Sequence, residues 1–223
     1  MLKHTLLATA MIGLCSAPAF AETPYRPDVA NFDGGDGIAL GADPAFDPIG
    51  TNTIEFWVAA GWSSDPGYDP VILSNTGANG TAYLVSILRD RDGLGILAGD
   101  TEIYTAFDFS DGRLSHVAII EGEGALSVII NGQVRSVHQV DFQELAGTEL
   151  FIGSADGQTA PFIGAIGQLR IWREALSRET LGAFIMADVL SPTKGDHPLI
   201  DALSVMSDFD DRTVLIADAP AKS

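Results

Sequence analysis

Cysteine and basic residues are scarce in this sequence. Its 223 residues include one cysteine, Cys15, and 12 lysine and arginine residues against 30 aspartate and glutamate residues, for a formal net charge of −18 at pH 7. A disulfide within the chain is excluded, because it needs two cysteines. The negative charge argues against a nucleic-acid partner. No stretch approaches the roughly 18 uncharged apolar residues of a membrane-spanning helix, so we predict no membrane insertion.

The N-terminus has the pattern of a secretory signal peptide. Lys3 and His4 precede an apolar run over residues 6–14, and the small-residue pattern Ala-Phe-Ala follows at 19–21. This pattern predicts a signal peptide over residues 1–21, cleaved after Ala21, and a secreted or periplasmic mature protein. Lipidation at Cys15 is the alternative, which we disfavour because Leu14 stands where lipoprotein signals carry a small residue.

Short apolar or alternating runs, broken by turn residues about every 8 to 12 positions, fill the chain from Asn31 to Ile171. This spacing predicts an all-β domain, a sandwich or a barrel. Asp92-Gly93 and Asn131-Gly132 each predict a tight type I′ hairpin, and Gly122 with Gly124 predicts a looser turn. The expected strands are 37–40, 53–60, 70–74, 82–89, 94–98, 102–109, 115–121, 125–131, 134–140, 149–154 and 164–173.

One short helix is expected near residues 177–189. Ser177 is a favourable N-cap and Glu179 lies in the first turn, where a negative charge is stabilising. Pro192 and Gly195 then interrupt the chain. We divide the mature protein into a lead-in, 22–30, the β-sandwich domain, 31–187, and a C-terminal extension, 188–223, which could pack on the sandwich.

Four motifs stand in order along the chain. They are Asn-Phe-Asp-Gly-Gly-Asp-Gly at 31–37, Thr-Ile-Glu-Phe-Trp-Val at 53–58, Ser-His-Val-Ala at 115–118 with the run ending in Asn-Gly at 126–132, and the closing segment 162–176. Together they resemble the laminin-G-like, concanavalin A-like lectin/glucanase superfamily, in the form found in bacterial secreted proteins. The resemblance implies a jelly roll, a sandwich of two antiparallel sheets. Fold alone does not give function, because the family includes lectins, adhesion modules, pentraxin-like proteins and glycan-cleaving enzymes.

The resemblance also implies a calcium ion near one rim of the sandwich. Asp33 and Asp36 lie in the first motif and are the candidate ligands, since a hard cation prefers carboxylate and carbonyl oxygens. Where the family often has Ile-Asp-Glu, this chain has Ile-Gly-Gln at 166–168, which removes one expected ligand. The alternative is that both aspartates stabilise turns beside glycines. Calcium is the one cofactor that we consider.

A turn-rich segment at 61–70 carries two aromatic residues, as binding loops of rigid sandwiches often do. Its aromatic rings could stack on sugar rings while its aspartates accept hydrogen bonds from hydroxyls, although a tryptophan that ends a strand also commonly closes a core. A second segment, 75–81, has small polar side chains suited to hydroxyls, or serves only as a connection. The candidate ligand-binding residues are Trp62, Asp65, Tyr68, Asp69, Asn75 and Asn79.

The sequence contains no recognisable catalytic motif. Glycan-cleaving enzymes need two converging carboxylates, and Glu55 is the only acidic residue in its strand. His116 lies in an apolar strand that we interpret as structural. We therefore predict a non-catalytic recognition module for a glycan or an extracellular protein surface. The alternatives are a hydrolase or lyase of the same fold and a structural envelope or adhesion component; the oligomeric state is not predicted.

Overall fold

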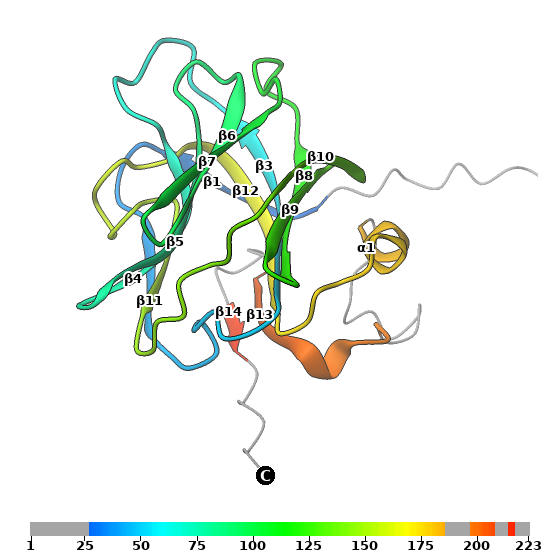
Figure 1. The fold of residues 1–223 in the computed structure, drawn as a ribbon. Helices are drawn as coiled ribbons and strands as arrows, with labels where there is room; N and C mark the ends of the chain where they lie inside the picture. Colours follow the sequence, from blue (N-terminus) through cyan, green and yellow to red (C-terminus); the bar gives the residue numbers. More distant parts are fainter. Residues whose placement is uncertain (1–26, 186–196, 208–213, 217–223) are drawn as a thin grey trace, which may run out of the picture.

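Two antiparallel sheets face each other in the computed structural model, which describes residues 27–185, 197–207 and 214–216 (Figure 1). The predicted all-β sandwich of jelly-roll type is confirmed. The expected signal peptide, 1–21, lies outside the described residues and stays a prediction. The helix ends at Phe184, with Ile185 as its C-cap, and is therefore shorter than the expected range 177–189. Within the described ranges no helix is long and apolar enough to cross a membrane.

The larger sheet has eight strands, in the order β10-β9-β8-β3-β12-β13-β14, with β1 beside β12. β1 (Val29–Asp33) pairs with the first half of β12 (Ile163–Trp172), and β13 (Leu203–Ser207) pairs with the second half. The expected C-terminal extension therefore contributes two strands to this sheet. The remaining strands are β3 (Asn52–Ala60), β8 (Ser115–Gly122), β9 (Ala125–Ile130), β10 (Gln133–His138) and β14 (Val214–Ile216).

The smaller sheet has six strands in the order β2-β11-β4-β5-β6-β7. Four of them, β4, β5, β6 and β7, follow one another in the chain and form a meander, so successive hairpins place them side by side. The strands are β2 (Ile38–Ala42), β11 (Glu149–Ile152), β4 (Val71–Gly77), β5 (Gly80–Ile87), β6 (Gly93–Ala98) and β7 (Thr101–Ala106).

Side-chain alternation decides which face of each strand enters the core. In β5, Tyr83, Val85 and Ile87 are buried between the sheets, with exposed fractions of 1% or less. Leu84 and Ser86 consequently point to the outer face of the smaller sheet. Burial of each large apolar side chain contributes about 1.5–3 kcal/mol, which fixes the register and hence the set of residues on the outer face.

The hairpins correct two of the three turn predictions. The turn at Gly122–Gly124 is a tight two-residue turn and not a looser one, because Gly122 pairs with Ala125 and both Glu123 and Gly124 have positive φ, 54° and 76°. Asn131 and Gly132 both have positive φ, 51° and 74°, as the predicted type I′ turn requires. At Asp92-Gly93 the prediction is wrong, because the connection runs from Leu88 to Asp92, with positive φ at Arg91, and Gly93 already belongs to β6.

The helix begins where it was predicted. α1 (Arg178–Phe184) has Ser177 as its N-cap, whose side chain accepts a hydrogen bond from the Thr180 backbone N–H at 3.0 Å. Leu181 is buried in one cluster with Trp172 of β12. The helix lies on the outer side of the larger sheet (Figure 1). A 3-10 turn, Ile200–Ala202, then leads into β13. The outer face of the larger sheet is thus partly covered.

Candidate functional site

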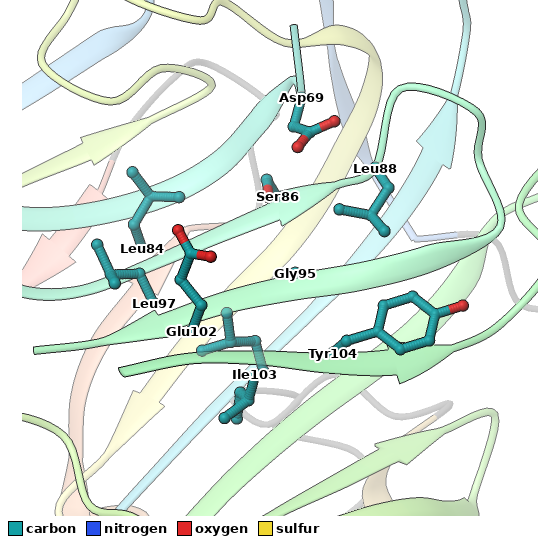
Figure 2. Close-up of a pocket in the computed structure, with 10 residues that line it drawn as sticks. Asp69, Leu84, Ser86, Leu88, Gly95, Leu97, Glu102, Ile103 and Tyr104 are labelled. Carbon is teal, nitrogen blue, oxygen red and sulfur yellow. The ribbon is translucent and has the colours of Figure 1, made fainter. Parts of the chain in front are cut away.

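A hollow of about 520 Å³ lies on the outer face of the smaller sheet (Figure 2). Strands β5, β6 and β7 form its floor, and Asp69, just before β4, stands at its rim. Its volume falls in the range of roughly 300–1,000 Å³ that is usual for small-molecule sites in proteins. The hollow is therefore large enough for one or two sugar rings.

The shape of the hollow depends on a glycine in the middle of β6. Gly95 pairs with Ser86 on one side and with Tyr104 on the other, so these three residues form one cross-strand row. A Cβ atom at Gly95 would lie 3.0 Å from the Ser86 Oγ and 3.2 Å from the Leu88 Cδ2. Because Gly95 has no side chain, the floor sinks between Ser86 and Tyr104.

Tyr104 provides a fixed aromatic surface at the hollow. Its side chain is 48% exposed. Its ring covers Gly93 so closely that a Cβ there would overlap it, and its hydroxyl donates a hydrogen bond to the Asp92 carbonyl at 3.1 Å. Partial desolvation and the negative charges of Asp92 and Asp90 raise the pKa of the Tyr104 phenol. A neutral ring held at both ends is suited to stacking.

Polar groups at the hollow are available to a ligand. The Ser86 hydroxyl is mostly buried at the floor and makes no hydrogen bond to any residue that the structure describes. Asp69 uses Oδ1 to accept the Arg89 backbone N–H at 2.8 Å, which leaves its other oxygen for hydroxyl groups. Glu102 is exposed on β7. Together with the Leu84 and Leu97 side chains, these groups give an apolar floor with polar groups around it (Figure 2).

Two of the residues predicted to bind a ligand are buried instead. Trp62 is 6% exposed, packs edge-on against Phe162, and donates its indole N–H to the Arg89 carbonyl at 2.9 Å. Asn75 is fully buried in β4 and donates to the Phe46 carbonyl at 2.8 Å. Neither side chain can reach a sugar, so both assignments are corrected to structural roles.

The other predicted binding residues do not gather at one place. Asp65 accepts the Gly67 backbone N–H at 2.8 Å within its own turn. Tyr68 is half-buried, with its hydroxyl donating to the Pro161 carbonyl at 3.2 Å. Asn79 is exposed at the two-residue turn between β4 and β5. Of the six predicted residues, only Asp69 lines the hollow.

The predicted calcium ligands are both exposed near the start of the domain. Asp33 Oδ1 accepts the Gly35 backbone N–H at 3.0 Å, which is the turn-stabilising role considered from the sequence. In the part of the chain that the structure describes, no three histidine, cysteine, aspartate or glutamate side chains come together as a metal site would require. Calcium at Asp33 and Asp36 stays a prediction.

A second recess, of about 430 Å³, lies at the turn between β8 and β9 and is acidic. Glu121 accepts hydrogen bonds from the Asn52 amide at 2.9 Å and the Phe142 backbone N–H at 2.6 Å. Burial raises the pKa of the Glu121 carboxyl above its usual range, and the nearby charges of Asp141 and Glu144 raise it further.

This raised pKa predicts a specific pH dependence. The folded state binds the Glu121 proton more tightly than the unfolded state, so the contribution of this group to stability is largest in acid. The free energy of unfolding of the wild type relative to Glu121→Gln should fall as the pH rises above about 4.5, the ordinary pKa of the group, and level off beyond the folded-state pKa. Urea titrations of both proteins across this pH range check the sign; a difference that rises with pH would contradict it.

A buried polar network lies on the opposite sheet, around Glu55. Its Oε2 contacts the His116 Nε2 at 3.0 Å, and its Oε1 accepts the Trp172 indole N–H at 2.9 Å and an Arg170 Nη1 bond at 3.4 Å. Burial alone would raise the pKa of Glu55, but the His116 hydrogen bond and the Arg170 charge outweigh it and hold the pKa below its usual value.

This network is closed to a substrate. The Glu55, His116 and Arg170 side chains are 3–4% exposed, and Arg170 also donates to the Phe184 carbonyl at the end of α1. The glutamate and histidine thus have a structural role, in agreement with the interpretation of His116 from the sequence.

The sequence profile of one family matches residues 32–182, about two-thirds of the chain. The chain belongs to the concanavalin A-like lectin/glucanase superfamily. Its laminin-G-type profile covers nearly all described strands except β1, β13 and β14. The resemblance seen in the four motifs is therefore confirmed. No curated protein matches the sequence.

Solved structures share the superfamily fold at low identity. A candidate carbohydrate-binding protein from Bacteroides ovatus is 17% identical with a TM-score of 0.58; the match covers 87% of this chain and 61% of that protein. The CBM40 domain of the Ruminococcus gnavus IT-sialidase, bound to α2,3-sialyllactose, is 16% identical with a TM-score of 0.58 over 72% of this chain and 97% of the domain. A Limulus polyphemus pentraxin is 16% identical with a TM-score of 0.54 over 89% of both chains.

Proposed function

We propose that this protein is a secreted, non-catalytic module that binds a glycan in the hollow on the smaller sheet. The observation that carries the proposal is that the fixed, half-exposed Tyr104 ring and the Ser86 hydroxyl line one hollow, on either side of Gly95. Sugar recognition combines an aromatic face for the apolar side of the ring with hydrogen-bonding groups for its hydroxyls. Asp69 and Glu102 supply further acceptors around an apolar floor.

The comparisons support the same proposal from another direction. One protein of this fold holds sialyllactose and another is named for carbohydrate binding. At 16–17% identity this similarity shows a shared fold and does not identify the ligand. The ligand is therefore argued from the residues of this hollow.

The proposal is tested by titrating the mature protein with a panel of oligosaccharides and following heat. For the oligosaccharide that binds, Tyr104→Ala should weaken the affinity by about tenfold or more, because the variant loses the stacking surface. Val137→Ala, which trims an exposed side chain on β10 of the other sheet, is the control and should bind as the wild type does. Equal affinities for wild type and Tyr104→Ala would rule out this site.

The same titration tests whether glycan binding depends on calcium. Repeating it with calcium, and again after chelation with EDTA, separates a calcium-dependent site from one that the protein forms alone. If Asp33 and Asp36 hold an ion that supports binding, the Asp33→Asn variant should lose the calcium response while keeping the calcium-free affinity.

The hydrolase or lyase alternative has its own test. Chromatography of each bound oligosaccharide after long incubation should show unchanged material. Shortened products that disappear in Glu102→Gln or Asp69→Asn would identify these carboxylates as catalytic and overturn the non-catalytic part of the proposal.

A further inference from the structure

The charges at the hollow are of one sign. Asp69 and Glu102 both line it, and none of its lining residues, all of which lie in the described part of the chain, is basic. Asp69 stands before β4 and Glu102 on β7, so the carboxylates come to the hollow from separate elements (Figure 2). A ligand in the hollow is therefore exposed to negative charge from two separate elements.

The charges near Tyr104, at the other end of the hollow, are also negative. Tyr104 donates its hydroxyl to the carbonyl of Asp92, and the charges of Asp92 and Asp90 are felt at its phenol as a raised pKa. Arg91, between these aspartates, directs its guanidinium to the Trp62 carbonyl at 3.2 Å and the Ser110 carbonyl at 3.5 Å. This arginine is thus held by other loops.

Arg89 follows Leu88, a lining residue of the hollow, in the chain. It contacts Asp69 through its backbone N–H, not through its guanidinium, and its side chain does not line the hollow. Acidic sugars need a basic partner at the position of their carboxylate, sulfate or phosphate group. The residues that line the hollow provide two carboxylates and no basic side chain.

We propose that the hollow selects glycans that carry a free amine, such as deacetylated amino sugars, and rejects acidic glycans. The inference rests on the proposed glycan-binding function and deepens it. A protonated amine is attracted by the Asp69 and Glu102 carboxylates and by the face of the Tyr104 ring. A carboxylate or sulfate is repelled by the same groups, which is selectivity by exclusion of the wrong ligand.

The test uses three β-1,4-linked tetrasaccharides with a common backbone: glucose units, glucosamine units and glucuronate units. They are titrated at low salt, at a pH low enough to protonate the amine, together with an array of neutral, amine-bearing, sialylated and sulfated glycans. The amine-bearing glycans should bind roughly three- to tenfold more tightly than their neutral counterparts, with acidic glycans weakest. Added salt should reduce the differences in affinity among the three classes of glycan, because it screens exposed charges.

Charge-neutralising variants assign the effect to the hollow. Asp69→Asn and Glu102→Gln should each lower the affinity for the amine-bearing ligand more than the affinity for its neutral counterpart, so that the ratio of the two affinities falls. Asp111→Asn, which removes an exposed carboxylate outside the hollow, is the matched control and should keep the wild-type preference.

The outcomes separate the two proposals. If acidic glycans bind as well as or better than amine-bearing ones, the proposed selectivity is wrong, although the proposed glycan-binding function is still supported. If no glycan of the array or the series binds, the proposed function fails and the selectivity falls with it. A preference for amines that survives both variants would also overturn the inference, because its source would lie elsewhere.

Discussion

Glu55→Ala is expected to lower the free energy of unfolding by about 3–5 kcal/mol. The substitution leaves three buried groups without their common partner, namely the Arg170 guanidinium, the His116 imidazole and the Trp172 indole N–H. An unpaired charge in the interior costs far more than the pair itself contributes. Chemical denaturation followed by far-UV circular dichroism measures the loss.

Two further variants make this result interpretable. Glu55→Gln keeps the shape and one acceptor for Trp172 but removes the charge that pairs with Arg170, so its loss should be smaller than that of Glu55→Ala. Arg113→Ala breaks an exposed ion pair with Asp111 at 3.8 Å and should change stability by about 0.5 kcal/mol or less. A loss for Glu55→Ala as small as that of Arg113→Ala would show that the network does not hold the larger sheet together.

The lowered pKa of Glu55 predicts that this network stops stabilising the fold at low pH. Because the folded-state pKa lies below the ordinary value of 4.5, the carboxylate stabilises the fold above that pH, and its contribution is lost as the pH falls through the folded-state pKa. The stability contribution of Glu55 therefore changes with pH in the opposite direction to that of Glu121.

Gly95→Leu should abolish glycan binding, with an affinity loss of about 100-fold or more, which corresponds to about 2.7 kcal/mol. The new side chain starts within 3.0 Å of the Ser86 Oγ and 3.2 Å of the Leu88 Cδ2 and fills the floor beside Tyr104. The neighbouring atoms are the ends of movable side chains, and Gly95 does not have a positive φ, so the fold should persist. Calorimetric titration gives the affinity and thermal unfolding reports the fold.

Ala39→Leu is the matched control for this prediction. It places the same leucine side chain at an exposed position of β2, in the same sheet but away from the lining residues. It should bind as the wild type does. Undiminished binding by a folded Gly95→Leu protein would place the ligand somewhere other than the hollow.

The fold could be predicted from the sequence because its determinants are local. Alternation of apolar residues located β3 and β8 to within a residue, and the capping chemistry of Ser177 located the start of α1. The Asn131-Gly132 turn was predictable because positive φ at two successive residues has few sequence solutions.

The site could not be predicted because it depends on register. A two-residue turn at Asp92-Gly93 would place Arg89 opposite Ile96, whereas the observed connection pairs Ile87 with Leu94 and so places Gly95 between Ser86 and Tyr104. The core burial of β5 and β6 decides between these registers. The sequence predicts Gly93 as a turn residue, whereas in the structure Gly93 allows the close approach of the Tyr104 ring.

Long-range packing explains the remaining errors. The turn-rich sequence around Trp62 indicated an exposed aromatic residue, but Phe162, a hundred positions later, packs against its ring. Glu55 is isolated in its strand, and its partners Arg170 and Trp172 stand 115 and 117 positions away. Local patterns contain no information on such contacts.

The central claim is that a glycan binds on the outer face of the smaller sheet, and mapping the ligand by NMR tests it most directly. Backbone amide shifts of the isotope-labelled mature protein are followed during titration with the tightest-binding oligosaccharide. We predict that the largest changes lie in Ser86–Leu88, Gly93–Leu97 and Glu102–Tyr104, around the hollow. Changes concentrated instead at residues 61–67, at the acidic recess around Glu121, or on the larger sheet would contradict the account.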